Sequence, residues 1–427
     1  MTVNDIACTR PTLAAWLAEY EAIAADYVES LRAAGIDFAP KHVDAAERAA
    51  LKERLARKGA RFRNGDASIS TGPLSTACEA CATDDGSRTF YLSLACNRNC
   101  YFCFNANQAD YEEGRRLKEN WRCELDAFLE GDVPVTHVAL TGGEPLLHPD
   151  EAVAFLARAH ARAPQAHLRL YTDGDFLTEA LLARLRDAGL TELRLSVKPD
   201  EEDAAEEALR RMTLTKRYIP QVMVEMPVIP GTLNEMKKLL QAMDDLGVFG
   251  INLLEFGYPM GNWEPFADRG FRIANPPFAI PYNYRYAGGL PVASSELACL
   301  KLVEFALDEG LSLGVHYCSL ENKNRTQIFQ QNSAVALDDA LWEFDRDDFF
   351  WKTAKVFDGD MTVAEPLLRE AGAPWARDPD EPSIQFHPRH LPLLAGTPVM
   401  PALSVNVVEQ HGGAPAVREL ALTLVAD

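Results

Sequence analysis

The sequence predicts an α/β protein, because short apolar runs alternate with longer amphipathic runs through the middle of the chain. The short runs have the length of buried strands, and the runs between them repeat apolar residues at helical spacing. Such alternation predicts parallel strands joined by right-handed helical crossovers. Three parts are expected: a helical N-terminal extension with a CxxC segment over residues 1–87, the α/β part over residues 88–325, and a small α+β unit over residues 326–427.

The N-terminal extension is predicted to be helical. Residues 11–34 carry apolar side chains at helical spacing, and residues 44–58 repeat the pattern. The polar, glycine-containing stretch over residues 61–72 is interpreted as a linker to the central part.

The central part is expected to alternate strands with helices. The strands are predicted at residues 89–95, 136–141, 167–172, 192–198, 220–228, 249–256 and 311–317. The helices between them are predicted at residues 110–130, 149–162, 178–188, 200–213, 232–246 and 293–309. Apolar runs typical of a small α+β fold follow at residues 351–357, 363–371, 382–386, 403–408 and 420–425.

Composition argues against several classes of protein. With 427 residues, 47% of them hydrophobic, the chain can bury a sizeable core. No stretch approaches the roughly 20 apolar residues of a membrane span, and the N-terminus lacks the basic and apolar regions of a signal peptide. A cytoplasmic location without a membrane partner is therefore expected. The net charge of −21 argues against a nucleic-acid partner, because phosphate contacts need clustered Lys and Arg. Nine cysteines, an odd number, indicate a reducing compartment and metal binding.

Three cysteines form the most informative motif. Cys96, Cys100 and Cys103 directly follow the apolar run at residues 90–95. Three thiolates on one loop can hold an iron–sulfur cluster, whose usual complement is four, and one iron is then open to a ligand. The alternative is a structural zinc loop or a set of core thiols. A zinc site would need a fourth ligand at similar spacing, and the next candidate, Cys123, lies in a helical stretch.

A second motif follows the next predicted strand. Gly142, Gly143, Glu144 and Pro145 close the apolar run at residues 136–140. Adjacent glycines allow the backbone to approach a ligand closely, and Glu144 offers an acceptor for an ammonium group. Alone, this segment would be an ordinary turn between a strand and a helix.

Together the two motifs resemble the radical SAM superfamily. The spacing C-x3-C-x2-C, the aromatic Phe102 before the last cysteine, and GGEP about forty residues later carry the resemblance. It implies a partial (β/α)6 barrel with a [4Fe–4S] cluster on the three cysteines. It further implies that S-adenosylmethionine binds the open iron through its amino and carboxylate groups, with GGEP at the methionyl amine. One electron, from a donor such as flavodoxin or ferredoxin, would then release a 5′-deoxyadenosyl radical.

Two further strand ends are candidate cofactor contacts. Thr172 and Asp173 stand at the family's "TNG" position, which lines the ribose and sulfonium side of the cofactor; a glycine turn with an Asx cap is the alternative. Ser196 and Lys198 point the same way by strand alternation, and in relatives this place contacts the ribose or the carboxylate. Lys198 could equally be a solvated strand end.

A long segment without a clear helix spans residues 257–291. It contains eight aromatic residues, which argues against disorder. A loop this long in a compact domain is usually functional, so it is interpreted as a lid over the substrate. The alternative is an insertion that packs on the side of the barrel.

A second metal site is suggested by Cys78, Cys81 and the later Cys318. CxxC serves zinc, clusters and redox couples alike. The order of CxxC, cysteine loop and late His-Tyr-Cys resembles an uncharacterised group related to pyruvate formate-lyase activating enzymes, and this implies an auxiliary iron–sulfur cluster. Cys8 and Cys299 are candidates for its fourth ligand. Cys78 and Cys81 should start near the bottom of the barrel and Cys318 near its top, so residues 82–88 would have to be extended.

The predicted function is a radical SAM enzyme that abstracts hydrogen from a small-molecule substrate, as a biosynthetic mutase, lyase or oxidoreductase. The aromatic lid favours this reading. A peptide- or protein-modifying enzyme, including a glycyl-radical activase, is the first alternative, because the helical extension could recognise a partner. A non-enzymatic iron–sulfur or zinc scaffold is the second. No residue is assigned as a catalytic acid or base.

Overall fold

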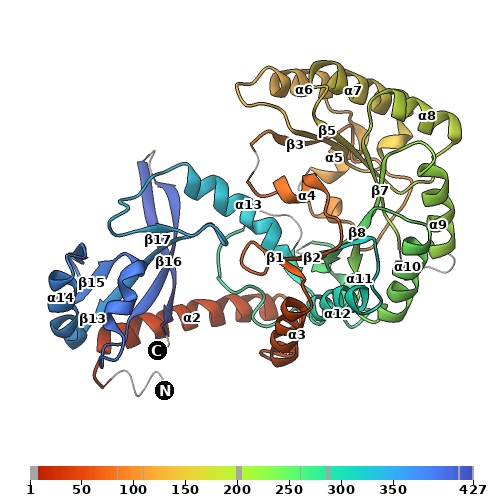
Figure 1. The fold of residues 1–427 in the computed structure, drawn as a ribbon. Coiled ribbons are helices and arrows are strands. Elements are labelled where there is room, and N and C mark those ends of the chain that lie inside the picture. The colour runs from red at the N-terminus through yellow and green to blue at the C-terminus, as the bar shows by residue number, and fades with distance from the viewer. Residues whose placement is uncertain are drawn as a thin grey trace. The chain divides into compact units, whose positions relative to one another are not determined.

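A computed structural model describes residues 8–83, 85–108, 110–198, 204–259, 261–284, 289–411 and 414–425. The chain forms two compact units (Figure 1). The barrel unit comprises residues 37–277 and 286–323, and the sheet unit comprises residues 1–36, 278–285 and 324–427. The N-terminal stretch thus contributes to both units. The expected boundaries at residues 87 and 325 stay predictions.

The barrel unit is built on a sheet whose strand order is β1-β2-β11-β8-β7-β6-β5-β4-β3. Seven of these strands run parallel: β3 (Ser87–Tyr91), β4 (His137–Thr141), β5 (His167–Thr172), β6 (Glu192–Leu195), β7 (Gln221–Val228), β8 (Gly250–Glu255) and β11 (Gly314–Cys318). Each neighbour in the order β3 to β8 follows its predecessor through a helical connection. The predicted parallel α/β fold of partial-barrel type is therefore confirmed.

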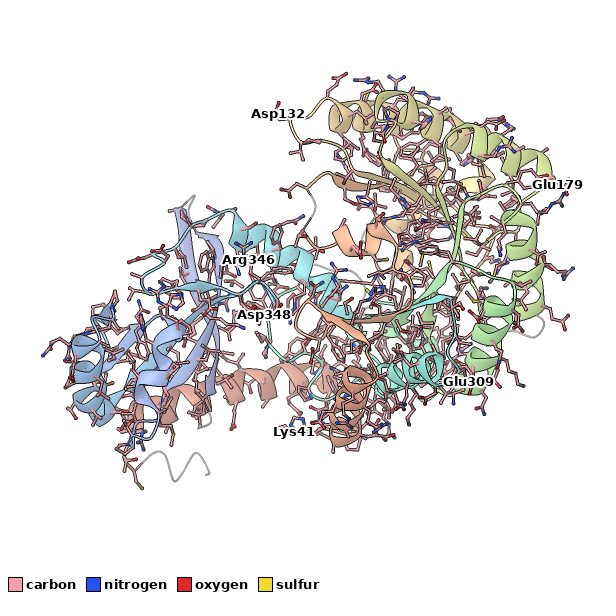
Figure 2. All side chains as sticks on the ribbon, in the orientation of Figure 1. Lys41, Asp132, Glu179, Glu309, Arg346 and Asp348 are labelled. Atoms are coloured by element: carbon pink, nitrogen blue, oxygen red, sulfur yellow. The ribbon has the colours of Figure 1, made fainter. Side chains whose placement is uncertain are left out.

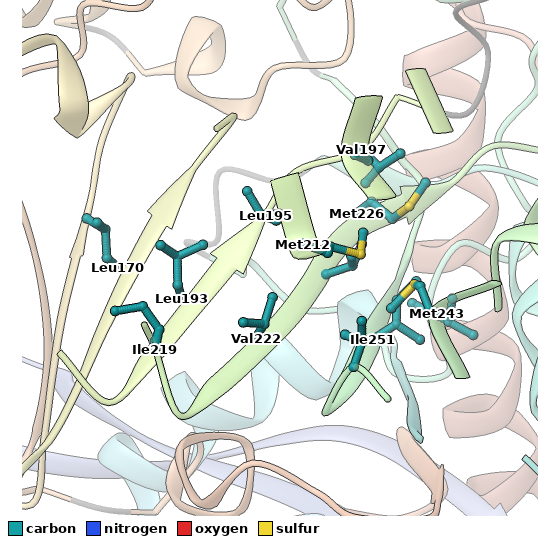
Figure 3. Packing of buried hydrophobic residues seen from close by; sticks show 14 of the residues in the cluster. Leu170, Leu193, Leu195, Val197, Met212, Ile219, Val222, Met226, Met243 and Ile251 are labelled. Carbon is teal, nitrogen blue, oxygen red and sulfur yellow. The ribbon is translucent and has the colours of Figure 1, made fainter. Parts of the chain in front are cut away.

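Helices cover the outer face of this sheet (Figure 1). They are α6 (Trp121–Leu129), α7 (Pro149–Arg162), α8 (Glu179–Asp187), α9 (Ala204–Thr215), α10 (Leu233–Asp245) and α12 (Ser295–Asp308). The core lies between these helices and the strands, and one buried cluster includes Leu170, Leu193 and Val222 of the strands with Met212 and Met243 of the helices (Figure 3). Because strand side chains alternate between faces, the positions between these apolar residues point to the inner face of the sheet.

The stretch at residues 61–72, expected to be a linker, is a β-hairpin. Its strands are β1 (Arg61–Arg63) and β2 (Ser68–Thr71), and β2 pairs antiparallel with β11. Only Ile69 of β2 is a large apolar residue, and it is fully buried on the outer face. Ser68 and Ser70 are buried on the other, polar face. A strand that buries serines lacks the apolar alternation by which strands are recognised.

The helix expected at residues 110–130 is divided into α5 (Tyr111–Arg116) and α6. Between them the chain runs beside the segment that leaves β3, where Leu94 N donates to Gly114 O (2.8 Å) and Glu119 N donates to Leu92 O (2.8 Å). The same pairing explains why β3 ends at Tyr91 rather than at residue 95. The break lies directly beside the cysteine loop.

The remaining elements of the barrel unit are short, except α3. They are α3 (Ala45–Arg57), α4 (Thr76–Ala80), β9 (Gly257–Tyr258), α11 (Glu264–Ala267) and β10 (Leu290–Pro291). Charged side chains such as Lys41, Asp132 and Glu179 are exposed on the surface (Figure 2). Among the described residues, no helix has both the length and the apolar character needed to cross a bilayer.

The sheet unit contains an antiparallel sheet in the order β14-β15-β13-β16-β17, with β12 paired to β13. Its strands are β12 (Glu343–Phe344), β13 (Trp351–Phe357), β14 (Trp375–Arg377), β15 (Ser383–Phe386), β16 (Ala402–His411) and β17 (Ala414–Leu424). Its helices are α2 (Pro11–Ala33), α14 (Met361–Glu370), most of α13 (Leu320–Ser333) and two 3₁₀ turns, η3 (Asp358–Asp360) and η4 (Pro388–Leu394). Helix α2 packs its buried Leu13 against Phe357 and Leu422. The small α+β unit expected at the C-terminus is present.

Candidate cofactor site and the polar barrel interior

The three cysteines lie on the loop that leaves β3. Cys96, Cys100 and Cys103 are unpaired and partly exposed. The loop closes where Cys103 N donates to Cys100 O (3.1 Å), and η1 (Phe104–Asn107) begins there. In the described ranges, no three His, Cys, Asp or Glu side chains converge on one position that suits a single metal ion. Three free thiols within eight residues are nonetheless the kind and number of ligands that an iron–sulfur cluster with one open iron requires.

The two glycines of GGEP hold the cysteine loop. Gly143 N donates to Ser93 O (3.0 Å), and Glu144 N donates to Ala95 O (2.7 Å). A Cβ atom on Gly143 would lie 1.9 Å from Ala95 O, and one on Gly142, whose φ is +121°, would lie 2.5 Å from Ser93 O. The close approach expected of these glycines is therefore made to the backbone that enters the cysteine loop, which only glycine permits.

The Glu144 carboxylate joins the ends of β4 and β5. It is buried and accepts hydrogen bonds from Leu146 N (2.8 Å), Thr172 Oγ1 (2.8 Å) and Asp173 N (2.7 Å). Leu146 lies in η2 (Pro145–Leu147), which Pro145 opens. Burial and the nearby Asp173 raise the pKa of Glu144. Three residues predicted to bind the cofactor are thus brought together at the carboxyl edge of the sheet.

An arginine inside the cysteine loop ties that loop to the turn after β5. Arg98 Nε donates to Asp175 Oδ2 (2.8 Å), and this contact lowers the pKa of Asp175. Arg211 Nη2 lies 2.8 Å from Asp175 Oδ1. Asp173 Oδ2 is 3.2 Å from Arg98 Nε, but this buried oxygen has no hydrogen-bond donor. It can therefore accept a hydrogen bond from a bound cofactor. The sequence analysis did not single out Arg98, although it is a cation within the three-cysteine segment.

The end of β6 brings a cation to the same edge. Lys198 hydrogen-bonds the Cys100 thiol; burial raises the pKa of that thiol and Lys198 opposes the rise. Ser196 is exposed, and its N–H donates to Thr172 O (3.0 Å). Pro199, the next residue of this segment, lies outside the described residues. Lys198 is therefore beside the cysteine loop rather than an isolated solvated cation.

Aromatic side chains hold the other side of the cysteine loop. The Phe102 ring centroid lies 5.0 Å from that of Tyr101 and 6.2 Å from that of Phe256, at the end of β8. Tyr101 also contacts Phe266 of α11, with the ring centroids 5.4 Å apart. Arg269 stacks over Tyr101 at 4.0 Å. Residues early in the predicted lid therefore pack directly on the cysteine loop.

The rest of the predicted lid divides between the two units. Residues 257–277 belong to the barrel unit, and residues 278–285 belong to the sheet unit. Tyr282 of the second part donates to Glu409 Oε1 (2.9 Å). Tyr286, one of the eight aromatics, lies outside the described residues.

Cys78 reaches the inner face of the barrel. It lies on α4, and its Sγ accepts hydrogen bonds from Arg194 Nη2 (3.3 Å) and Asn252 Nδ2 (3.3 Å). Both donors are buried. Two buried side chains therefore direct N–H groups at the Cys78 sulfur.

Cys318 and Cys81 belong to the same neighbourhood. Cys318, at the end of β11, is buried and accepts a hydrogen bond from Asn322 Nδ2 (3.2 Å). Burial raises its pKa to about 12; Cys81 and Cys78 contribute to the rise, and Lys323 opposes it. Cys81 itself is exposed. Cys299, a candidate fourth ligand, is buried in the apolar core on α12.

The segment that brings Cys78 toward Cys318 differs from the predicted one. Helix α4 carries Cys78 to the level of Asn252, which pairs with His316. His316 is two residues before Cys318 in the same strand. Residues 82, 83, 85 and 86 form turns, and residues 87 and 88 begin β3. Helix α4 therefore brings Cys78 toward the strand that carries the late cysteine, and only residues 87 and 88 of the predicted extended segment lie in a strand.

The inner face of the sheet is polar. Arg194 donates to Glu192 (2.5 Å) and pairs with Glu225. Asn252 bridges Glu225 (2.7 Å) and His316 (2.8 Å), and burial lowers the pKa of His316 to about 3, so this imidazole is neutral. Further polar residues on this face are Ser68, Ser75, Arg169 and Tyr171. In the sequence, only Glu225 stands out among these residues, as an acid within an apolar run. The barrel therefore encloses a polar interior beneath the cysteine loop.

Comparison with known proteins agrees with this arrangement. Residues 90–243 match the family model of the radical SAM superfamily. A Methanocaldococcus jannaschii protein named for glycyl-radical enzyme activation is 28% identical over 60% of this chain and 66% of its own length. A GTP 3′,8-cyclase of Xanthomonas axonopodis is 37% identical over 30% of this chain and 38% of its own length. The structure of Streptococcus suis SuiB bound to precursor peptide SuiA aligns with a TM-score of 0.41 and 12% identity, over 58% of this chain and 52% of that chain. The chain spans less than two thirds of each relative.

Proposed function

Because residues 90–243 match the family model of the radical SAM superfamily, we propose that this chain is a radical SAM enzyme that abstracts hydrogen from a small-molecule substrate inside the barrel. The proposal rests on one observation. Several candidate residues lie together at the carboxyl edge of the parallel sheet: the cysteine loop, the cluster of Glu144, Thr172 and Asp173, and Lys198. In folds of this kind the active site lies at that edge.

The chain's residues suit the cofactors that this family uses. Cys96, Cys100 and Cys103 would hold the [4Fe–4S] cluster, which when bound supplies the electron that cleaves S-adenosylmethionine. Lys198 offers a cation for the carboxylate of S-adenosylmethionine, and Asp173 Oδ2, which accepts no hydrogen bond, offers an acceptor. Gly142, Gly143 and Pro145 fix the loop around this site, Phe102 packs the cysteine loop against β8, and Ser196 adds an exposed hydroxyl.

The enclosed polar interior supports a small substrate. Its Arg, Glu, Asn and His side chains lie beneath the cofactor edge, and their groups are aimed inward. A protein or peptide substrate is the second candidate, favoured by the name of the Methanocaldococcus jannaschii relative. We further propose that a protein such as flavodoxin or ferredoxin donates the electron, and that the protein is located in the cytoplasm.

The two candidates are separated by the source of the abstracted hydrogen. The anaerobically reconstituted enzyme, with dithionite and S-adenosylmethionine, is incubated with the small-molecule or the protein fraction of a deuterium-labelled cell extract. We expect deuterium in 5′-deoxyadenosine only with the small-molecule fraction, by mass spectrometry. Transfer from the protein fraction alone would replace the proposal with the second candidate.

We expect Glu144→Gln to weaken binding of S-adenosylmethionine by about 1.5–3 kcal/mol, the usual worth of a hydrogen bond to a charged group. The amide keeps the size of the side chain but loses the charge that would face the cofactor's ammonium. Calorimetry on the reconstituted protein measures the change, and the iron content should stay the same.

Glu255→Gln is the matched control for this variant. Glu255 is also a buried glutamate at the end of a strand, with a pKa raised by burial and by Glu296, and it accepts from Leu320 N (2.9 Å). It lies outside the predicted site, so binding should not change. Equal dissociation constants for wild type and Glu144→Gln would leave Glu144 as a purely structural link between β4 and β5.

A further inference from the structure

Arg169 is a buried cation that has no hydrogen-bond or ion-pair partner among the described residues. It lies in the middle of β5, on the inner face, and is 7% exposed. Within the part of the chain that the structure describes, its guanidinium makes no hydrogen bond and no ion pair, and its Nε is fully enclosed. Its Cζ lies 5.7 Å from the centroid of the Tyr171 ring.

The neighbouring carboxylate is already engaged. Register places Ala139 of β4 and Glu192 of β6 beside Arg169. Glu192 accepts from Arg194 Nε (2.5 Å) and Ser75 Oγ (2.6 Å), and it lies 3.3 Å from His167 Nε2. Ala139 offers no polar group. Among the described residues, no carboxylate forms an ion pair with Arg169, and its contact is with the Tyr171 ring.

A buried arginine of this kind is costly. A guanidinium cannot lose its proton in a protein, and the desolvation of an unpaired buried charge costs several kcal/mol. Buried arginines are usually paired with carboxylates. Arg194, on the next strand, is 3% exposed and pairs with both Glu192 and Glu225. Arg169 is nearly as buried as Arg194 but has no such carboxylate partner in the described part of the chain. A ligand with a negative charge would supply one.

We propose that Arg169 binds the carboxylate or phosphate group of an anionic small-molecule substrate inside the barrel. A guanidinium suits both groups, since each can accept two parallel hydrogen bonds. Arg169 stands three residues before Thr172, so it lies about 10 Å along the strand from the cofactor edge. Held there by its anionic end, the substrate would extend its reacting C–H toward the cofactor. This inference names the substrate class and rests on the proposed function.

Arg169→Met and Arg194→Met form a matched pair for the test. Both remove a buried guanidinium from the inner face and keep a side chain of similar length. We expect Arg169→Met to leave the thermal midpoint of the ligand-free protein unchanged or higher, because it removes an uncompensated charge. Arg194→Met should lower the midpoint, because it leaves Glu192 and Glu225 unpaired. A comparable loss in Arg169→Met would make Arg169 a structural residue and overturn the proposal.

Binding is tested with malonate and inorganic phosphate at constant ionic strength, by calorimetry on the full-length reconstituted protein. We expect at least one of the two probes to bind wild type, and its binding to be at least tenfold weaker in Arg169→Met. Arg169→Lys, which keeps the charge, should bind it with intermediate affinity and guards against a misfolded methionine variant. Equal affinity in wild type and Arg169→Met, or no binding of either probe to wild type, would overturn the proposal.

Cleavage of S-adenosylmethionine separates this inference from the proposed function. Without substrate, the slow dithionite-driven formation of 5′-deoxyadenosine should be the same in wild type and Arg169→Met, because Arg169 lies away from the cofactor edge. Lost anion binding with retained cleavage supports the inference. Absence of cleavage in wild type itself would refute the proposed function, and the anion-binding result would still decide whether Arg169 is an anion site.

Discussion

Replacing Cys96, Cys100 and Cys103 together with alanine should abolish 5′-deoxyadenosine formation in the presence of dithionite and S-adenosylmethionine. Without the three thiols no site remains from which an electron can reach the sulfonium. Chromatography with mass spectrometry measures the product, and we expect the level of the enzyme-free control.

Cys123→Ala is the matched control for the triple variant. Cys123 is an exposed, unpaired cysteine on α6, outside the cysteine loop. Its loss should leave the rate of 5′-deoxyadenosine formation unchanged. Undiminished product from the triple variant would end the radical SAM assignment of these cysteines.

The parallel strands and their helices were predictable because their outer faces are apolar. Leu168 and Leu170, or Val222 and Val224, are fully or nearly fully buried against helices, and this burial is what hydrophobic periodicity reports. The cysteine loop and GGEP were found for a different reason. Their chemistry needs particular residue types at short spacing, so the signal is local in the sequence.

The polar interior could not be predicted, because its partners are distant in the sequence. Arg194 contacts Ser75 and Glu225, and His316 contacts Ser68 and Asn252 across the sheet. Each of these side chains, read alone, is an ordinary polar residue near a strand. Only the register of the sheet shows which charges are compensated.

The two glycines were correctly expected to allow a close approach, but the group that they approach is not the expected one. Close backbone approach was expected at Gly142 and Gly143, and it is present. The approach is to Ser93 and Ala95, at the entry of the cysteine loop. The motif therefore shapes the cysteine loop through the backbone.

The triple alanine variant should still bind iron at a second site. We propose an auxiliary iron–sulfur cluster on Cys78, Cys81 and Cys318, supported by the two N–H donors at Cys78 and by Cys81 and Cys78 lying near enough to Cys318 to contribute to the raised pKa of that thiol. Two [4Fe–4S] centres require about eight irons per chain, so the triple alanine variant should keep about four.

Metal analysis of the triple variant after anaerobic reconstitution separates the alternatives. Adding Cys318→Ala should remove the residual iron, because Cys318 is buried beside the CxxC segment. Adding Cys299→Ala instead should retain it, since Cys299 lies in the apolar core on α12. A structural zinc site would give no residual iron and about one tightly held zinc per chain. If the triple variant binds neither metal, Cys78 and Cys81 are ordinary thiols and Arg194 and Asn252 serve only the packing of α4 in the barrel.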